Sequence, residues 1–220
     1  MTQAPTEPTP AAPRWQRRPE ARPEEILRAA LQSFVERGFA ATKLEDVGAR
    51  AGVSKGTVYL YFSNKEDLFR SAVRASILPY IESGEERIAG YEGDPLDLLR
   101  ELFDRWVGVV TDPVLGGIAK LMVAEAGNFP EVARFYMDEV VKRTRALFAA
   151  VIQRCMEAGR LRPAPVDFVV RDLTAPILFA TLWRHSLASH DDTPLDFPRY
   201  LDFHFSLVLQ GLRPDAGPLP

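Results

Sequence analysis

The stretch TKLEDVGARAGVSKGTVYLYF, Thr42 to Phe62, decides the fold of this chain. Thr42-x-x-Glu45 matches a capping box, which predicts that a short helix begins there. Gly52 follows where a helix ends in the left-handed conformation that glycine adopts without strain. Ser54 then offers a second N-cap oxygen. Two short helices joined by a tight glycine-containing turn predict a helix-turn-helix, whose second helix enters the major groove of DNA.

The outward side chains of the second helix favour a nucleic-acid contact. Val58 and Phe62, four residues apart, are the predicted inward pair. Tyr59, Leu60 and Tyr61 are then exposed unless another molecule covers them. The alternative is a satellite helical hairpin with stray surface aromatics. The residues predicted to contact DNA are Thr42, Lys43, Ser54, Lys55, Gly56, Thr57, Tyr59, Leu60, Tyr61 and Lys65.

The flanking residues extend this pattern. Arg22 to Arg74 carries ILxAALxxFxxxGF at positions 26–39 and AGVSKGTVYxYFxNKExLF at positions 51–69, and it resembles the DNA-binding domain of the tetracycline-repressor (TetR) family of bacterial regulators. The resemblance covers about a quarter of the chain. It departs from the family at Gly48, where alanine is usual, and at Leu60, where an aromatic residue is frequent.

The resemblance implies an all-α fold of about nine helices. An N-terminal three-helix domain would bind DNA, and a C-terminal helical bundle would bind an effector and form the dimer. We predict the boundaries 1–22 for a disordered basic and Pro-rich arm, 23–70 for the DNA-binding domain, 71–212 for the bundle and 213–220 for a frayed tail. Arg14, Arg17, Arg18 and Arg22 of the arm could follow a minor groove, although a solvated tail explains them equally.

Composition sets further limits. The net charge is -3, but residues 1–70 hold 11 Lys and Arg against 9 Asp and Glu, so the helix-turn-helix end is the more basic. Cys155 is the single cysteine, which excludes a disulfide framework and suits a reducing cytoplasm. No apolar run reaches the length of a membrane span, and the N-terminus lacks a signal-peptide layout.

Capping signals predict where further helices begin. Ser63-x-x-Glu66 is a second capping box, and it opens a fourth helix that Pro79 should kink or break. Asp94 and Asp112 each precede a proline, as an N-cap precedes the first helical residue. The longest predicted helix runs from Phe129 to Gly159.

The last two predicted helices have more apolar surface than one core requires. Residues 166–189 are apolar nearly all round between Leu173 and Trp183, and residues 196–212 carry two apolar stripes. A second copy of the chain is the simplest partner for the surplus, so we predict a homodimer through these helices, as in the resembled family. Two recognition helices related by a two-fold axis imply a near-palindromic operator.

The resemblance also implies a cavity for a small apolar effector in the bundle. The residues predicted to line it are Phe103, Trp106, Met122, Glu125, Phe129, Met137, Phe179 and Trp183. Each of the apolar ones could instead be ordinary core, and Glu125 could pair with a buried cation rather than face a ligand. A DNA-binding or architectural protein without an effector is the alternative function.

No catalytic role is predicted. His185, His190 and His204 are not joined by a Glu-x-x-His pair, so no di-iron bundle is encoded. No phosphate-binding glycine loop or nucleophile motif is present, and we expect no cofactor and no metal site.

Overall fold

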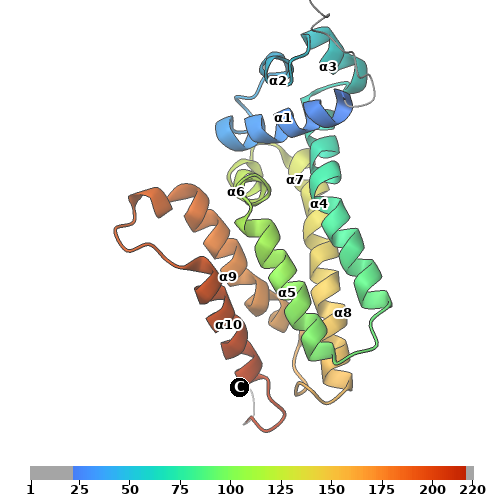
Figure 1. Ribbon diagram of the computed structural model, residues 1–220, viewed down its shortest axis with the longest axis vertical. Helices are drawn as coiled ribbons and strands as arrows, with labels where there is room; N and C mark the ends of the chain where they lie inside the picture. Colours follow the sequence, from blue (N-terminus) through green and yellow to red (C-terminus); the bar gives the residue numbers. More distant parts are fainter. Residues whose placement is uncertain (1–21, 217–220) are drawn as a thin grey trace, which may run out of the picture.

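The computed structural model describes residues 22–216, and every regular element in that range is helical (Figure 1). The elements are α1 (Arg22–Arg37), α2 (Leu44–Arg50), α3 (Lys55–Tyr61), α4 (Lys65–Ala89), α5 (Pro95–Thr111), α6 (Leu115–Glu125), α7 (Pro130–Tyr136), the π-helical segment η2 (Met137–Lys142), α8 (Arg143–Glu157), α9 (Val166–Ser186), the short 3₁₀ turn η3 (Ala188–His190) and α10 (Phe197–Gly211). Because α7, η2 and α8 follow one another without a break, the described residues form nine α-helical stretches, as predicted. Arg14, Arg17 and Arg18 of the predicted arm lie outside the described residues.

Helices α1, α2 and α3 form a small head at one end of the molecule, and the other helices form the bundle below it (Figure 1). Helix α1 has Glu24 and Glu25 in its first turn, where carboxylates favour the positive end of the helix dipole. Gly38 follows α1 with φ of +87°, so it terminates the helix as predicted. Ile26, Ala30 and other α1 residues are buried against α4 and α2.

Helix α4 joins the head to the bundle. It runs unbroken for 25 residues through Pro79, so of the predicted kink or break at that residue the break is wrong and the kink stays a prediction. Proline removes one backbone hydrogen bond, but the buried side chains on both sides of it, Ile77 and Ile81 among them, hold the helix against its neighbours. The helix therefore passes directly from the head into the bundle, and the domain boundary at residue 70 stays a prediction.

The bundle helices begin with the expected caps. The Asp94 carboxylate accepts a hydrogen bond from the Leu96 amide at 3.0 Å, and Pro95 is the first residue of α5. The Asp112 carboxylate accepts from the amides of Val114 and Leu115 at 2.9 Å each, but the regular helix α6 begins only at Leu115. The second cap thus holds a turn that leads into α6 rather than its first helical residue.

The longest predicted helix contains an irregular segment. Helical structure runs from Pro130 to Glu157, but Met137–Lys142 adopts the wider π-helical form. Such segments are rare and often occur at functional sites. This one lies in the middle of the bundle, with Val140 buried.

Helices α9 and α10 form an outer layer on one side of the bundle (Figure 1). Helix α9 continues through Pro176 and ends at Ser186, followed by the turn Ala188–His190. The Asp196 carboxylate caps α10 by accepting from the Arg199 amide at 3.1 Å. His204 Nε2 lies 2.9 Å from the Asp172 carbonyl oxygen and ties α10 to α9.

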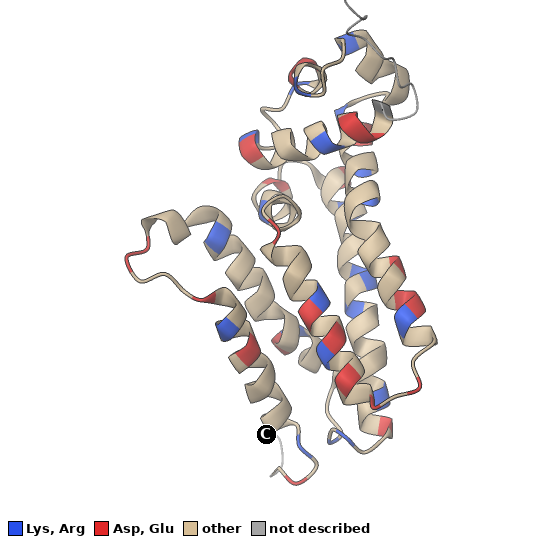
Figure 2. Cartoon of the chain, viewed as in Figure 1, with Lys and Arg blue, Asp and Glu red and all other residues tan. Residues whose placement is uncertain are grey.

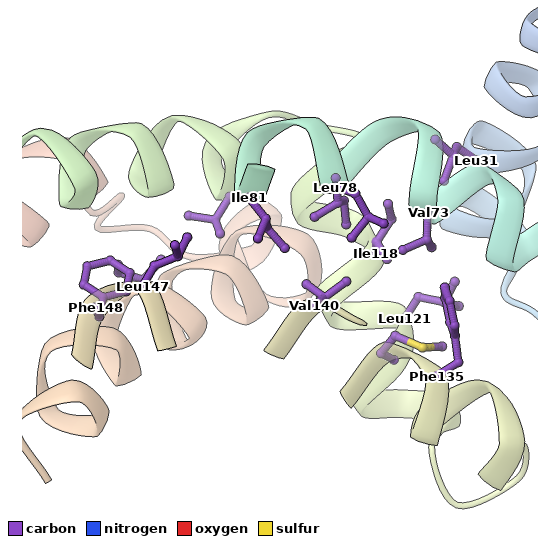
Figure 3. Packing of buried hydrophobic residues seen from close by; sticks show 14 of the residues in the cluster. Leu31, Val73, Leu78, Ile81, Ile118, Leu121, Phe135, Val140, Leu147 and Phe148 are labelled. Carbon is purple, nitrogen blue, oxygen red and sulfur yellow. The ribbon is translucent and has the colours of Figure 1, made fainter. Parts of the chain in front are cut away.

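One apolar core connects the head and the bundle. Figure 3 shows Leu31 of α1 beside Val73 of α4, with Ile118 and Leu121 of α6 and Phe135 of α7 nearby. The cluster continues along the bundle to Phe148 of α8. Because close-packed groups transmit displacements, the head cannot shift without disturbing the upper bundle.

Charges of both signs lie along α5 and the end of α4 that is far from the head (Figure 2), and several are paired between helices. Arg87 of α4 binds the Glu101 carboxylate of α5, and Arg143 of α8 binds Glu85 of α4 at 2.9 Å. Within residues 22–216, no single helix is long and apolar enough to cross a membrane. The bent pair α5 and α6 reaches the required length and composition only across a 74° angle, and both helices bury their apolar faces in the bundle.

Candidate DNA-binding surface and effector cavity

The turn between α2 and α3 has the geometry predicted from its glycine and serine. Gly52 has φ of +68°, which favours glycine. Ser54 Oγ accepts a hydrogen bond from the Thr57 amide at 3.1 Å and caps α3. Gly48 permits the close approach of α2 and α3, since a Cβ there would lie 3.1 Å from the Val53 carbonyl oxygen and 3.3 Å from a methyl of Val58. The departure from the usual alanine thus fits this particular turn.

Helix α3 presents one face inward and leaves the other uncovered. Val58 is fully buried and Phe62 nearly so, as predicted. Tyr59, Leu60 and Tyr61 are 47%, 77% and 40% exposed. Helix α3 therefore holds three large side chains on a surface that the rest of the described chain does not cover.

The predicted capping box at the start of α2 is wrong. The Thr42 hydroxyl points inward, 2.7 Å from the Gly38 carbonyl oxygen and 3.1 Å from that of Ser33. Glu45 does not reach back, because its carboxylate forms an ion pair with Lys55. Thr42 is 2% exposed, so its side chain is not available to a phosphate in this conformation.

The ion pair between Glu45 and Lys55 links α2 to the first turn of α3. Side-chain hydrogen bonding holds the pKa of Glu45 below its usual range and raises that of Lys55. Lys55 Nζ also lies 5.6 Å from the centre of the Tyr59 ring. Both charged groups are exposed, so the pair orients Lys55 without burying it.

The second predicted capping box is shifted by one residue. Asn64, not Ser63, is the N-cap of α4, and its side chain accepts from the Asp67 amide at 2.7 Å. The Asp67 carboxylate in turn accepts from the amide and hydroxyl of Ser63 at 2.9 and 3.0 Å. Glu66 is not part of this cap.

Lys65 lies at the start of α4 and is already bound within the chain. Its ammonium group donates to the Ala40 carbonyl oxygen at 3.0 Å and lies 4.8 Å from the centre of the Phe39 ring. Of the other predicted contacts of this surface, Lys43 and Gly56 are exposed, and Thr57 is half-buried with its hydroxyl 2.9 Å from that of Ser54. A Cβ added to Gly56 would meet only Ser54 Oγ, at 3.8 Å, so the described fold itself does not require glycine there.

The bundle contains a cavity of about 510 Å³, a volume typical of small-molecule sites. Helices α5 to α9 and the segment η2 border it, and it opens to the surface where Val123, Met137 and Leu178 are exposed. The lining residues are Trp106, Val110, Ala119, Met122, Val123, Ala126, Ala133, Tyr136, Met137, Val140, Val141, Thr144, Arg145, Arg171, Thr174, Ala175, Ile177, Leu178 and Thr181.

Of the residues predicted for the effector, Trp106, Met122 and Met137 line this cavity. The other five do not. Phe103 is core and packs on Phe205, with ring centres 4.8 Å apart. Phe179 is 46% exposed on the outer face of α9, and the indole N–H of Trp183 donates to the Asp191 carboxylate at 3.2 Å.

The remaining two, Phe129 and Glu125, contact the head instead. Phe129 packs against Phe39, with ring centres 4.6 Å apart. Glu125 Oε1 accepts from the Ala40 amide at 3.3 Å, and Glu125 Oε2 from the Asn128 side chain at 3.2 Å. The expected pairing of Glu125 with a buried cation is therefore also wrong. Glu125 thus binds the amide of Ala40, and Lys65 binds its carbonyl oxygen. We call these two contacts the Ala40 clamp.

The polar residues of the cavity were not predicted. Thr144, Arg145 and Arg171 line it, together with Tyr136. The spacing of Tyr136, Val140 and Thr144 at every fourth residue is a helical-face signal that could have identified them. The widened segment η2 within that face leaves no recognisable sequence signature.

Helices α9 and α10 carry exposed apolar side chains, as expected from their surplus of apolar residues. Phe168 and Phe179 of α9 are 64% and 46% exposed, and Phe203 and Leu207 of α10 are 66% and 55% exposed. Singly exposed apolar residues are ordinary, but four on two adjacent helices form a patch that is typical of an interface.

Comparisons with known proteins match both parts of the chain. The family model for bacterial regulatory proteins of the tetR family matches residues 26–72, and the model for the tetracyclin repressor-like C-terminal domain matches residues 92–195. The HTH-type transcriptional repressor KstR2 of Mycolicibacterium smegmatis is 24% identical over 210 residues, which are 94% of this chain and 98% of that protein.

Two further proteins are similar to this chain. The HTH-type transcriptional regulator AcrR of Shigella flexneri is 37% identical over 79 residues, 36% of this chain and 37% of that protein. The solved SmeT–triclosan complex superposes with a TM-score of 0.73 and 25% identity, covering 91% of this chain and 99% of that one.

Proposed function

Because the chain belongs to the tetracycline-repressor (TetR) family of bacterial regulatory proteins, we propose that it is a homodimeric repressor that a small effector releases from a near-palindromic operator. The observation that carries DNA binding is the uncovered face of α3. Tyr59, Leu60 and Tyr61 are exposed there, next to a helix-turn-helix turn that is built around Gly52 and Ser54.

The proposed contacts divide into two groups. Lys43, Lys55, Tyr59 and Tyr61 would hold phosphates, and these contacts position the protein without reading sequence. Thr57 and Leu60 would lie nearest the base edges, where an apolar side chain can contact the methyl group of thymine.

Three other predicted residues have more limited roles. Gly56 would let the backbone approach DNA, since nothing within the described fold accounts for a glycine there. Ser54 contributes mainly as the cap of α3, and Lys65 has to share its ammonium group with the Ala40 carbonyl. We leave the Thr42 side chain out of the contact surface because its hydroxyl is bound inside the head.

The exposed apolar patch on α9 and α10 supports the dimer. A two-fold axis would place the same patch on both subunits and bury Phe168, Phe179, Phe203 and Leu207. Dimerisation would hold two α3 helices one DNA turn, or a multiple of it, apart.

The cavity supports an effector over the alternative of a regulator without one. Helix α6 contributes Ala119, Met122 and Val123 to the cavity, its C-cap residue Ala126 adds to them, and the helix reaches the head through Glu125. We propose that α6 and the head together can take two positions, and that a ligand binds one of them more tightly. The ratio of its affinities for the two positions limits how far it can shift the population. The related SmeT was solved as a complex with triclosan.

An operator selected from random duplexes provides the test. Fluorescence anisotropy would compare that operator with a scrambled duplex over a range of salt concentrations. Lys43→Ala should weaken binding to both duplexes about equally and reduce the salt slope by about one. Leu60→Ala should weaken operator binding about tenfold while leaving the scrambled duplex almost unchanged.

Lys142→Ala is the matched control, because Lys142 is an exposed lysine of the bundle whose one ion-pair partner among the described residues is Asp138. It should change neither affinity. If Lys43→Ala and Leu60→Ala behaved like this control, α3 would not be the reading helix.

A further inference from the structure

The cavity in the bundle has polar groups on only part of its wall. Trp106, Val110, Met122, Ile177 and Leu178 supply apolar surface. Two consecutive residues at the start of α8, Thr144 and Arg145, supply a hydroxyl and a guanidinium group. A ligand that fills this space therefore meets mostly hydrocarbon, with the donors of Thr144 and Arg145 on the α8 part of the wall.

Arg145 differs from the other arginines of its helix. Arg143 binds the Glu85 carboxylate at 2.9 Å, and Arg154 donates to the carbonyl oxygens of Ile88 and Tyr91 at 2.9 and 2.7 Å. Arg145 is half-buried at the cavity, and no described residue forms a hydrogen bond or an ion pair with it. Its guanidinium group is therefore free to bind an anionic group of a ligand that enters the cavity.

Thr144 likewise lacks a hydrogen-bond partner in the described part of the chain. It is 6% exposed, and its Oγ1 is buried without a hydrogen-bond partner among the described residues. The other two threonines of the cavity are satisfied: Thr174 donates to the Val170 carbonyl at 2.7 Å and Thr181 to the Ile177 carbonyl at 2.8 Å. A buried hydroxyl left without a partner destabilises the structure, so a ligand that accepts from it gains affinity.

The charges on the cavity wall favour a ligand with a single negative charge. Arg171, the second guanidinium of the cavity, is paired with the Asp167 carboxylate at 3.0 Å. Arg145 thus provides the one unneutralised positive charge among the described residues of the cavity wall. Burial raises the pKa of Tyr136 above its usual range, so its phenol remains a protonated neighbour of the site and adds no negative charge.

We infer that the effector is an amphipathic organic acid, whose carboxylate binds Arg145 and the Thr144 hydroxyl while its hydrocarbon body fills the apolar part of the cavity. A guanidinium fork matches the two oxygens of a carboxylate, and the hydroxyl supplies a third donor. The inference rests on the proposed function, because it names the chemical class of the ligand to which that function responds.

Direct binding measurements test this assignment. Isothermal titration calorimetry on the full chain would compare octanoate, dodecanoate and 4-phenylbutyrate with their methyl esters, which keep the body and remove the charge. At least one acid should bind about tenfold more tightly than its ester, the ratio expected for one charge-assisted hydrogen-bonded pair.

Variants then locate the carboxylate. Arg145→Met should abolish the preference for the acid and leave the affinity for the ester within about twofold, and Arg145→Lys should restore part of the preference. Arg184→Met removes an exposed arginine of α9 that does not line the cavity and should keep the full preference. Thermal denaturation of each variant would verify that it folds.

The inference is wrong if no acid binds, if acids and esters bind equally to the natural sequence, or if Arg145→Met keeps the preference. Operator binding, measured separately, distinguishes this from failure of the proposed function. A protein that binds acids through Arg145 but no operator would overturn the regulatory function alone. A protein that binds its operator but shows no preference for acids would overturn only the carboxylate assignment.

Discussion

The two faces of α6 differ in how completely they are packed. Toward the head, a Cβ added to Gly117 would lie only 2.3 Å from a methyl of Val35, and Glu125 reaches the Ala40 amide. Toward the cavity, Met122, Ala126 and their neighbours border about 510 Å³ of unfilled space. The side of α6 that faces the head is tightly packed, whereas the side that faces the cavity leaves space for a ligand.

This difference teaches how a ligand could act on DNA binding. A close-packed interface does not deform gradually, so a displacement of α6 from the cavity side has to move the head or break the junction. We therefore expect the contacts that face the head to stabilise the fold and to couple the cavity to DNA binding. The residues that face the cavity should tolerate substitution with little loss of stability. Three substitutions test it, in decreasing order of their expected effect on stability.

Phe39→Ala should cause the largest loss. Phe39 is fully buried, and its ring centre lies 5.5 Å from those of Phe34 and Phe69 and 4.6 Å from that of Phe129. Truncating a buried phenylalanine costs about 3–5 kcal/mol. Urea denaturation at fixed protein concentration would measure it. Leu178→Ala, on the cavity wall and 44% exposed, should cost less than about 1 kcal/mol, and equal losses at the two positions would contradict the comparison.

Gly117→Ala should have an intermediate effect. The new methyl would overlap Val35, and overpacking of this kind costs about 1–3 kcal/mol. Val35→Ala should make room, so the double variant should lose less stability than the two single losses added together. Gly127→Ala is the control, since a Cβ there meets no described atom within 4 Å. Strictly additive losses from Gly117→Ala and Val35→Ala would show that the junction is not tightly packed.

Glu125→Ala should change stability least, by about 1 kcal/mol or less, because its hydrogen bonds lie in a half-exposed place. Its expected effect is on coupling. Removing one side of the Ala40 clamp should reduce, several-fold, the loss of operator affinity that saturating dodecanoate causes. Anisotropy with and without the acid would measure this loss. Glu131→Ala, which removes an exposed ion pair with Arg134, is the control and should leave the loss of operator affinity unchanged. If Glu125→Ala also left that loss unchanged, the clamp would play no part in coupling.

Local signals predicted the elements of the fold well. Gly52, Ser54 and Asp94 act as predicted because each needs only its own neighbours in sequence to end or cap a helix. Thr42 and Glu45 were misinterpreted because distant groups compete for them. Carbonyl oxygens at the end of α1 take the Thr42 hydroxyl, and Lys55 takes the Glu45 carboxylate.

The cavity was predicted only in part, for a different reason. Large apolar residues fill a core or line a cavity according to how far apart the helices lie, and no sequence pattern reports that distance. Trp106 and Phe103 are three residues apart on α5, yet the first borders the cavity and the second packs against Phe205. The unpaired donors of Thr144 and Arg145 become visible only once their neighbours in space are known.

The π-helical segment Met137–Lys142 lets the long helix hold an extra residue without changing the direction in which α8 faces. A π-helical turn takes about one residue more than an α-helical turn, so deleting one residue from the segment would restore regular α-helix while α8 keeps its orientation. Thr144 and Arg145 would then stay on the cavity wall, and only the side chains of the segment itself would change position. Homologues could thus gain or lose this turn through a single-codon insertion or deletion and keep the donors at the start of α8.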